Sequence, residues 1–352
     1  MTDFLTVSLF VIFLFIIISL SSFGAVWFYT RWAHKKSILD IPNQRSSHTQ
    51  VTPRGGGFGF LAIFFIFFLA MAYALSFVAT AVALVGVALV LAMVGAIDDL
   101  KGLPAKVRIV FHFIVAGLGV YIFMSEPYYL NMGILTLKAP FLVFTFLILF
   151  SVWMINLYNF MDGIDGIAAG QVISVSLATL FFANKYLLDV DDSTRGLVFI
   201  FYSIALAAAC FGFLIMNWPP AKVFMGDVGS SVLGFLLAAQ AIWGSQEYGV
   251  NFSVFLVLNT YFIGDATYTL LIRAFRRIKV WEAHKSHLYQ RLDQKGISRK
   301  KVFLLLVSYN LFYLLPLAMW IQEKPNFSWI GLLLAYMPVF ILAFKYKAGQ
   351  KS

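Results

Sequence analysis

The chain of 352 residues is 61% hydrophobic, only 12% charged and carries a formal net charge of +10. Its mean hydropathy is +0.86, whereas a soluble domain has about 25% charged residues. A water-soluble globular protein is therefore excluded, and we predict a polytopic membrane protein. Continuous apolarity also excludes a closed β-barrel, whose strands would alternate polar and apolar residues over about 10 positions.

Apolar runs recur along the whole chain, and a hydrocarbon core of about 30 Å needs about 20 helical residues. We predict an all-α bundle of about eleven transmembrane helices in a single domain, 1–352. The first run exceeds the apolar core of a signal peptide, and Asp3 replaces the expected basic residue, so we expect this span to be retained. The predicted spans are approximately 4–28, 57–75, 78–97, 109–125, 140–157, 167–183, 197–215, 229–246, 252–272, 302–321 and 329–344.

Basic residues are distributed unevenly between the two predicted faces. With the N-terminus outside, all of the 26 Lys and Arg residues fall on the cytoplasmic side except Lys138, Lys185, Arg195 and Lys324, as the positive-inside rule requires. The acids expected outside are Glu126, Asp189, Asp191, Asp192, Glu247 and Glu323. We therefore expect a periplasmic N-terminus and a cytoplasmic C-terminus. The positive charge then serves topology and anionic-lipid contact, so nucleic-acid binding is not needed to explain it.

Asp98 and Asp99 end the third predicted span. Adjacent carboxylates at a helix C-terminus repel each other and face the negative end of the helix dipole. A bound divalent cation would compensate, as would Lys101, Lys106 and Arg108 just downstream; a solvated acid pair at the membrane edge is the plain alternative. Successive helical residues point about 100° apart, so we expect the two acids to differ in role.

Between two apolar runs, amides and acids repeat at a step of three residues. They are Asn156, Asn159, Asp162 and Asp165. On a helix they would form one polar stripe, although Gly163 and Gly166 make an unwound backbone plausible. Ionisable groups near a membrane segment are costly unless they are paired, hydrated or metal-bound. This set suits a hydroxylated or heterocyclic substrate, with or without Mg²⁺; an ordinary connecting turn is the alternative.

Asp227 lies between glycines in the segment Phe224–Ser230, where the eighth predicted span begins. Backbone amides at a helix N-terminus can hold a phosphate or stabilise the aspartate itself. An ordinary N-cap aspartate is the alternative. The segment is not a Walker P-loop, because the required Gly-Lys-Ser or Gly-Lys-Thr is absent.

The longest basic loop carries His284, His287 and Arg291 at steps of three and four residues. One helical face could then present two imidazoles and a guanidinium to a diphosphate. Zinc is the alternative ligand, which the absence of a nearby cysteine and the charged surroundings disfavour. Asp265, about two turns above Arg273 in the ninth predicted span, either lines the same cavity or pairs with a neighbour.

All of these clusters fall on the expected cytoplasmic face, in segments 30–56, 98–108, 156–166, 216–230 and 273–301. A transporter would more often place polar groups near the midplane, in broken helices of two repeated halves, and the chain shows no convincing repeat. An enzyme that joins a water-soluble substrate to a lipid is therefore favoured. A transporter or flippase for a polyprenyl-linked sugar is the rival.

Four motifs, taken in order, resemble those of the polyprenyl-phosphate N-acetylhexosamine-1-phosphate transferases. They are Asp98-Asp99, Asn156-x-x-Asn159-x-x-Asp162-Gly-x-Asp165-Gly, Phe224-Met-Gly-Asp227-x-Gly-Ser230 and His284-x-x-His287-Leu-Tyr-Gln-Arg291. The resemblance runs from about residue 40 to 292. The peptidoglycan branch has three adjacent histidines where this chain has His284-Lys-Ser-His287. The O-antigen and common-antigen branch is instead similar to Pro42-Asn43-x-Arg45-x-x-His48 and Pro53-Arg54-Gly55-Gly56-Gly57.

The resemblance implies a reaction in which a UDP-activated sugar and undecaprenyl phosphate give undecaprenyl-diphospho-sugar and UMP, with Mg²⁺ or Mn²⁺ required. It points to UDP-GlcNAc or a related N-acetylated 6-deoxyhexose such as FucNAc or QuiNAc. The product would initiate lipid-linked O-antigen or related polysaccharide at the bacterial inner membrane. We expect UDP-N-acetylhexosamine, undecaprenyl phosphate and membrane lipids as partners, and no nucleic acid; a homodimer stays open.

The resemblance also implies residue roles. Asp98 and Asp99 would be catalytic, with Asp98 orienting or deprotonating the lipid phosphate, and Asp227 and Asp99 would hold the metal. The other sets are Asn156, Asn159, Asp162 and Asp165 for the nucleotide sugar, His284, His287 and Arg291 for the diphosphate, and Lys106 and Arg108 for the lipid phosphate. A phosphate monoester is largely ionised at pH 7, since its second pKa is about 6. General-base catalysis therefore adds modestly, and a covalent phospho-aspartate route stays open.

Overall fold

The computed structural model describes residues 2–42, 50–124, 129–133, 135–187, 193–280 and 284–350. Several residues singled out in the sequence lie outside the described residues. They are Asn43, Arg45 and His48 of the family-like segment and the acids Glu126, Asp189, Asp191 and Asp192. The side chains of Lys185 and Arg195 also lie outside the described part.

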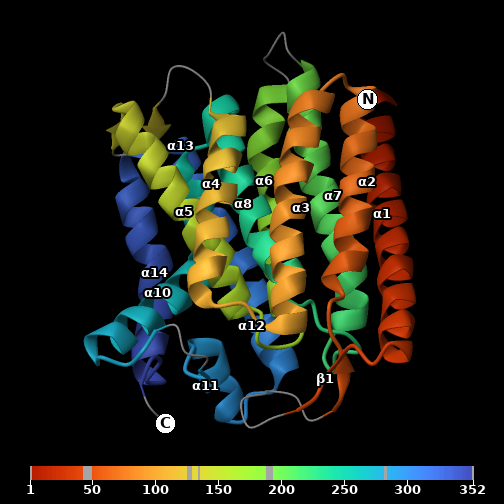
Figure 1. Ribbon diagram of the computed structural model, residues 1–352. Helices are drawn as coiled ribbons and strands as arrows, with labels where there is room; N and C mark the ends of the chain where they lie inside the picture. The colour runs from red at the N-terminus through yellow and green to blue at the C-terminus, as the bar shows by residue number, and fades with distance from the viewer. Residues whose placement is uncertain are drawn as a thin grey trace.

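The described residues are nearly all helical, which confirms the predicted all-α membrane bundle (Figure 1). The helices are α1 (Thr2–Lys35), α2 (Gly57–Ala74), α3 (Val78–Lys101), α4 (Ala105–Phe123), α5 (Pro140–Met161), α6 (Ile167–Leu187), α7 (Ser193–Asn217), α8 (Asp227–Glu247), α9 (Phe252–Leu258), α10 (Thr260–Phe275), α11 (Leu288–Gln294), α12 (Arg299–Tyr309), α13 (Leu315–Glu323) and α14 (Ser328–Lys345). A π-helical turn, Asn310–Leu314, joins α12 to α13, and a 3₁₀ turn, Pro325–Phe327, precedes α14.

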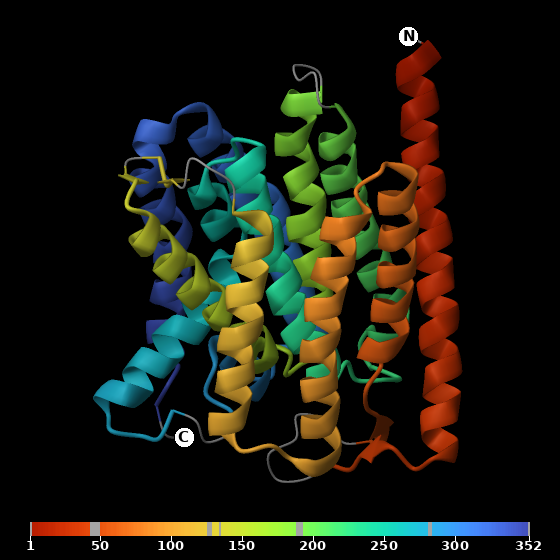
Figure 2. The ribbon, with the colours of Figure 1, turned by 45° about the horizontal axis from the view of Figure 1, so that its top comes forward.

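Two short antiparallel hairpins complete the described structure. The strand β1 (Leu39–Asp40) pairs with β2 (Thr52–Pro53), and β3 (Leu130–Asn131) pairs with β4 (Thr136–Leu137). The β1–β2 hairpin and α11 lie at the end of the bundle that holds the C-terminus, opposite the N-terminus of α1 (Figures 1 and 2). This end also carries the turn between α3 and α4 (Figure 2).

The predicted spans agree with the helices except at two places. Within the described residues, nine helices are long and apolar enough to cross a membrane. The ninth predicted span is instead a bent pair, α9 and α10, which meet at 75°. The described part of α6, Ile167–Phe182, is a shorter apolar helix.

A buried asparagine accompanies the bend between α9 and α10. Asn259 separates the two helices, and its amide donates to the Phe255 carbonyl at 3.0 Å. Tyr158 of α5 donates its hydroxyl to the same side chain at 2.9 Å. Asn259 lies within the predicted apolar span 252–272, so hydropathy alone predicts an unbroken helix there. The hydrogen bonds of Asn259 satisfy polar groups at the bend.

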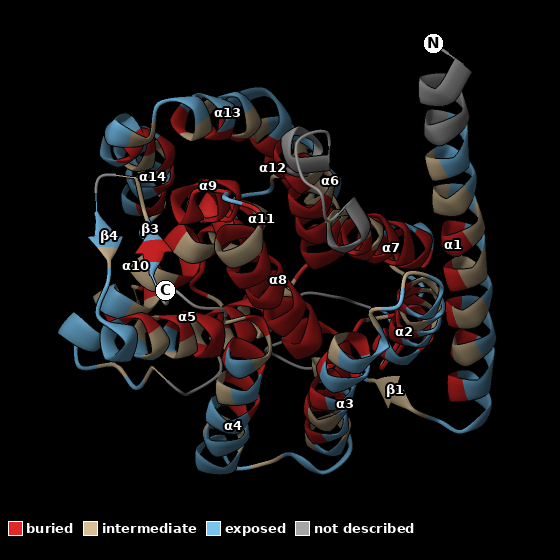
Figure 3. Cartoon of the chain, turned by 90° about the horizontal axis from the view of Figure 1, so that it is seen from above, coloured by how far each residue is buried: buried red, intermediate tan, exposed pale blue. Residues whose placement is uncertain are grey.

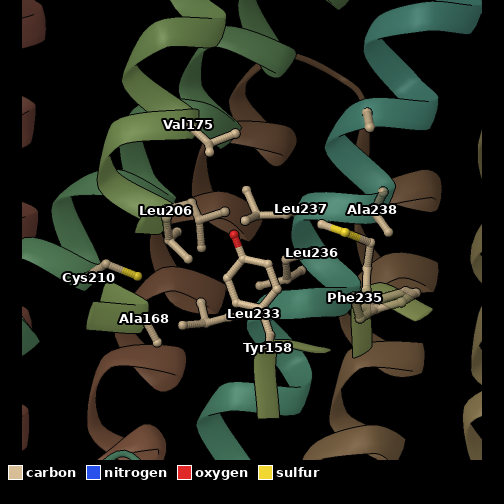
Figure 4. Packing of buried hydrophobic residues seen from close by; sticks show 14 of the residues in the cluster. Tyr158, Ala168, Val175, Leu206, Cys210, Leu233, Phe235, Leu236, Leu237 and Ala238 are labelled. Carbon is tan, nitrogen blue, oxygen red and sulfur yellow. The ribbon is translucent and has the colours of Figure 1, made fainter. Parts of the chain in front are cut away.

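The helix α8 lies at the centre of the bundle, almost wholly buried (Figure 3). Figure 4 shows Tyr158 of α5 packed among Leu233, Leu236 and Leu237 of α8. Because α8 is buried on every side, its backbone can shift little without disturbing the packed side chains around it. The first residue of this central helix is Asp227.

Candidate active site

The ends of α3 and α8 bring three acids together. Asp98 and Asp99 lie in the last turn of α3, and Asp227 is the first residue of α8. The helices meet through Gly95, where an added Cβ would lie 2.6 Å from the Asp227 carbonyl oxygen. Such a contact is closer than any side chain allows, so glycine is required for this approach.

Asp99 caps the helix that begins with Asp227. Its Oδ1 accepts the Asp227 backbone N–H at 3.0 Å, and its Oδ2 accepts the Val228 N–H at 3.2 Å. A carboxylate at this position satisfies unpaired amides and faces the positive end of the α8 dipole. The unfavourable electrostatics expected for two adjacent acids at the end of α3 are therefore offset in part by the N-terminus of α8.

Two arginines connect the three acids. Arg54 Nη2 lies 2.5 Å from Asp99 Oδ1 and 3.2 Å from Asp227 Oδ1. Arg108 Nη1 lies 2.5 Å from Asp98 Oδ2 and 3.6 Å from Asp227 Oδ2. Asp98 also accepts the Leu103 N–H. Asp98 and Asp99 thus have different partners, and Asp227 lies between the two guanidinium groups.

Arg54 is a site residue to which the sequence assigned no role. It belongs to the segment Pro53-Arg54-Gly55-Gly56-Gly57, which was noted only for its resemblance to one family branch. Backbone bonds hold this segment against the loop before α8: Gly56 donates to the Phe224 carbonyl, and Phe224 donates to the Pro53 carbonyl. An arginine followed by glycines, in a loop that the charge distribution predicts to be cytoplasmic, was the available signal.

The predicted polar stripe is split by the end of α5. Asn156 and Asn159 lie in the last turns of this helix, but Asp162 is its C-cap and Asp165 lies in the turn to α6. The four residues therefore do not share one helical face, and the unwound alternative describes the second half. Asn159 Nδ2 donates to Ser230 Oγ of α8 at 3.4 Å.

Asp162 is influenced electrostatically by the acid cluster. The pKa of its carboxyl is raised well above the usual range, first by removal from water and then by the negative charges of Asp227 and Asp99. An acid in this setting gains from any cation or hydrogen-bond donor brought into the site.

Asp165 joins the turn before α6 to the loop before α8 and to α12. It is 6% exposed and accepts the Ala221 N–H at 3.1 Å. Arg299 of α12 approaches both of its oxygens at 3.4 Å. Asp165 thereby holds the loop that leads to Asp227, and its contact with a nucleotide sugar stays a prediction.

The prediction that His284, His287 and Arg291 share one helical face is wrong, because α11 begins only at Leu288. The two histidines precede the helix, and their rings stack with centroids 4.9 Å apart. His287 is 3% exposed. The pKa of His284 is lowered to about 3, chiefly by burial and further by His287, Arg273 and Arg291. His284 is therefore neutral near pH 7.

Asp265 determines where α11 begins. This fully buried acid of α10 accepts the backbone N–H of Leu288 at 2.7 Å and that of Tyr289 at 3.1 Å. Of the two roles left open for Asp265 by the sequence, pairing with a neighbour describes these contacts. Tyr289 in turn donates its hydroxyl to the Phe160 carbonyl at 3.0 Å, which joins the histidine loop to the end of α5.

The C-terminal segment fastens the same loop. Gly349 donates its N–H to the Ser286 carbonyl at 2.8 Å. Arg291 donates to the Gln350 carbonyl and to Gln294 Oε1. The Arg291 guanidinium is thus partly engaged within the protein and would have to change partners to contact a diphosphate.

A cavity of about 810 Å³ opens beside the acid cluster, between α3, α4, α5 and α8. Much of its lining is apolar. The predicted site residues that line it are Asp98, Lys106, Arg108, Asn156, Asn159 and Asp227. The other predicted site residues, Asp99, Asp162, Asp165, His284, His287 and Arg291, are not part of this lining.

His112 is a cavity residue that the sequence reasoning missed. It lies one turn beyond Arg108 on α4, is only 6% exposed and lines the cavity. Its Nδ1 has no hydrogen-bond partner within the described structure. Its place in a long apolar run gave no signal beyond its being a polar residue in a membrane span.

The side-chain oxygens of the acid cluster differ in how well they could hold a metal ion. Among the residues that the structure describes, no three His, Cys, Asp or Glu side chains form a metal-binding group. Mg²⁺ commonly uses only one or two carboxylates together with water and substrate phosphates. Asp227 fits this requirement, because its two oxygens face the partly exposed side chains of Arg54 and Arg108. Asp99 fits poorly, because both of its oxygens cap α8.

The fold and site define a polytopic membrane protein with an acid and arginine cluster at one end of its bundle. The model of "Glycosyl transferase family 4" matches residues 81–245, which include this cluster's acids. The chain is 30% identical over 299 residues to decaprenyl-phosphate N-acetylglucosaminephosphotransferase of Mycobacterium leprae, covering 78% of this chain and 74% of that protein. The chain therefore belongs to glycosyltransferase family 4.

Two further relatives cover similar lengths. The Mycobacterium tuberculosis decaprenyl-phosphate N-acetylglucosaminephosphotransferase is 32% identical over 78% of this chain and 73% of its own. The Bacillus subtilis probable undecaprenyl-phosphate N-acetylglucosaminyl 1-phosphate transferase is 26% identical over 89% of this chain and 84% of its own. The family resemblance inferred from the four motifs is thus confirmed.

Proposed function

We propose that this protein transfers an N-acetylhexosamine-1-phosphate from a UDP-sugar to undecaprenyl phosphate and releases UMP. The observation that carries the proposal is the cavity whose apolar lining leads to Asp98, Arg108 and Asp227. An isoprenoid chain requires apolar contact, and its phosphate requires cations, so a single cavity with both properties suits a lipid phosphate. The relatives named above transfer N-acetylglucosamine phosphate according to their names.

The lipid phosphate would bind at the charged end of the cavity, between Lys106 and Arg108. Arg108 already contacts Asp98 at 2.5 Å. Through this contact Asp98 would hold the Arg108 guanidinium in place and so align the lipid phosphate. The same contact would limit how closely Arg108 can approach that phosphate. Since a phosphate monoester is largely ionised at pH 7, alignment contributes more than proton removal by Asp98.

In the transfer step, an oxygen of the lipid phosphate attacks the β-phosphorus of the UDP-sugar. A new P–O bond forms, the bond from the β-phosphorus to the bridging oxygen breaks, and that oxygen leaves with its electron pair as part of UMP. Phosphoryl transfer depends mainly on in-line positioning and charge neutralisation. Arg54 and Arg108 supply positive charge on either side of Asp227.

Asp227 would hold the required Mg²⁺ or Mn²⁺, which neutralises diphosphate charge when bound. Asp99 would act through its cap on α8, which fixes the position of Asp227. Asp99 is therefore a positioning residue in this proposal, in place of the metal-ligand role expected from the family resemblance. Direct displacement is preferred, because both Asp98 oxygens already accept hydrogen bonds.

The nucleotide sugar would approach from the end of α5 and the histidine loop. Asn159 and Asp162 offer amide and carboxylate groups beside the acid cluster. His284, His287 and Arg291 would face the diphosphate after Arg291 exchanges its contact with the C-terminal segment. We assign this side to the cytoplasm of a bacterial inner membrane, and the uneven distribution of Lys and Arg supports this assignment.

Among donors, UDP-GlcNAc is our first choice because the relatives' names specify N-acetylglucosamine. FucNAc and QuiNAc are the alternatives, with O-antigen or a related cell-surface polysaccharide as the final product. Purified protein should be incubated with undecaprenyl phosphate, Mg²⁺ and each UDP-N-acetyl sugar in turn. We expect UMP and a lipid-linked sugar from one donor. No UMP from any donor, together with movement of a lipid-linked sugar across vesicles, would favour the rival flippase.

A further inference from the structure

A second cavity, of about 530 Å³, lies between α1 and α7, apart from the cavity described above. Its apolar lining includes Trp27, Ile215 and Met216, and its basic lining consists of Arg31, His34 and Lys222. The volume is in the range of small-ligand sites, about 300–1,000 Å³. None of the residues that line it is acidic.

The positive charges of this cavity have no anionic partner in the part of the chain that the structure describes. Arg31 lies over the ring of Trp27, 3.8 Å from its centroid, which holds the guanidinium beside the cavity. Trp27 itself is 40% exposed. Unpaired cations beside an exposed indole are typical of the level at which a helix meets lipid headgroups.

The position of the lining residues along α1 and α7 also indicates that this cavity lies at the headgroup level. Arg31 and His34 belong to the last turns of α1, and Met216 belongs to the last turn of α7. These turns lie at the end of the bundle that carries the β1–β2 hairpin and the turn between α3 and α4 (Figures 1 and 2). Trp27 lies one turn before Arg31 on α1, so on this helix the apolar lining lies nearer the middle of the bundle than the basic lining.

We propose that this cavity binds the headgroup of an anionic phospholipid, with one acyl chain lying along α1 and α7. Charge complementarity carries the proposal, since three basic side chains and no acid surround one amphipathic cavity. The lining contains neither Asp98 nor Asp227. A polyprenyl phosphate bound there would not contact the proposed catalytic acids, so a structural phospholipid is the occupant to which we commit.

The bound lipid would steady the loop that carries Asp227. Lys222 lies in this loop, and its N–H donates to the Met216 carbonyl at 2.8 Å. On its other side the loop is held by Asp165, which accepts the Ala221 N–H. A phosphate contact at Lys222 would add a second attachment to this loop, next to the hydrogen bond of Ala221 with Asp165. Lipid binding is thereby linked to stability of the ligand-free protein.

The test measures lipid binding directly, with no UDP-sugar present, so that its failure is distinct from failure of the proposed activity. Delipidated protein is titrated with phosphatidylglycerol, and bound lipid is counted by native mass spectrometry. Phosphatidylcholine and undecaprenyl phosphate serve as separate probes. For Arg31→Gln/Lys222→Gln we expect binding of phosphatidylglycerol to weaken about thirtyfold, from about 1 kcal/mol per basic residue near an anionic lipid.

The matched control is Arg276→Gln/Lys295→Gln, which removes the same charge from exposed positions away from the cavity. It should bind phosphatidylglycerol as the wild type does. Both variants are first compared with the wild type by thermal unfolding in detergent, and Lys222→Gln alone replaces the double variant if that variant is unfolded. Equal binding by cavity variant and control would overturn the proposal. So would displacement of phosphatidylglycerol by equimolar undecaprenyl phosphate, which would assign the cavity to the substrate.

Discussion

Replacing Asp265 by Asn should loosen the histidine loop without altering any residue that faces the acid cluster. The carboxylate accepts three hydrogen bonds, from the backbone N–H groups of Leu288 and Tyr289 and from the Thr269 hydroxyl. All of these groups are buried. In the variant, Oδ1 can still accept from Leu288, but the new amide group points its hydrogens at the Tyr289 N–H.

The size of the effect follows from these contacts. A hydrogen bond to a charged group contributes about 1.5–3 kcal/mol, and an unpaired buried donor costs about 1–3 kcal/mol. We expect the loop to lose about 2–3 kcal/mol of docking free energy. Since 1.4 kcal/mol corresponds to a factor of ten, the ratio of docked to undocked loop should fall about 30- to 150-fold.

Amide hydrogen exchange at Leu288 and Tyr289 measures this ratio, and steady-state kinetics measure its consequence. Exchange should accelerate by the same factor, and the KM for the UDP-sugar should rise more than kcat falls. Thr269→Val is the matched control, because it removes one donor to Asp265 and leaves both amide contacts. Wild-type exchange and wild-type KM in Asp265→Asn would refute the capping role.

Three further predictions concern the acid cluster. Asp227→Asn should abolish metal-dependent turnover while circular dichroism and thermal unfolding stay near wild type; an active variant would remove its metal role. Gly95→Ala should lower kcat at least tenfold, because the new methyl would lie 2.6 Å from the Asp227 carbonyl oxygen, whereas Gly86→Ala on the same helix meets nothing within 4 Å; equal activity would contradict the close packing. Asp162→Asn should stabilise the ligand-free protein near neutral pH, because burial and the charges of Asp227 and Asp99 raise the pKa of Asp162 above its ordinary 3.8. Since the folded state binds this proton more tightly, the ionised acid costs stability increasingly above about pH 4, so the gain in Tm should vanish at lower pH; a gain that persists there would have another cause.

Hydropathy predicted the membrane spans well, because every span must bury about 20 apolar residues in lipid. It did not predict the 75° bend at Asn259. The groups that satisfy this bend come from α5, and Tyr158 is 101 residues away in the chain. Such tertiary hydrogen bonds leave no trace in local periodicity.

In the site, too, features that depend on neighbouring residues were predicted better than contacts between residues far apart in the chain. The helical step alone led us to expect different roles for Asp98 and Asp99, and the structure gives them different partners, Arg108 for Asp98 and the first backbone amides of α8 for Asp99. Arg54 was missed because its contact with Asp227 spans 173 residues. The shared helical face of the histidine loop was wrongly predicted from spacing, because α11 begins at Leu288, where Asp265 caps it.

The most direct test of the proposed reaction follows the β-phosphate. UDP-GlcNAc labelled at this phosphorus is incubated with undecaprenyl phosphate, Mg²⁺ and purified protein, alongside the other UDP-N-acetyl sugars if GlcNAc is not accepted. We predict that the label appears in the lipid fraction and that unlabelled UMP is released in equal amount, with neither product from Asp227→Asn. Labelled UDP in the aqueous fraction would contradict it, because the sugar would then have been transferred without its phosphate.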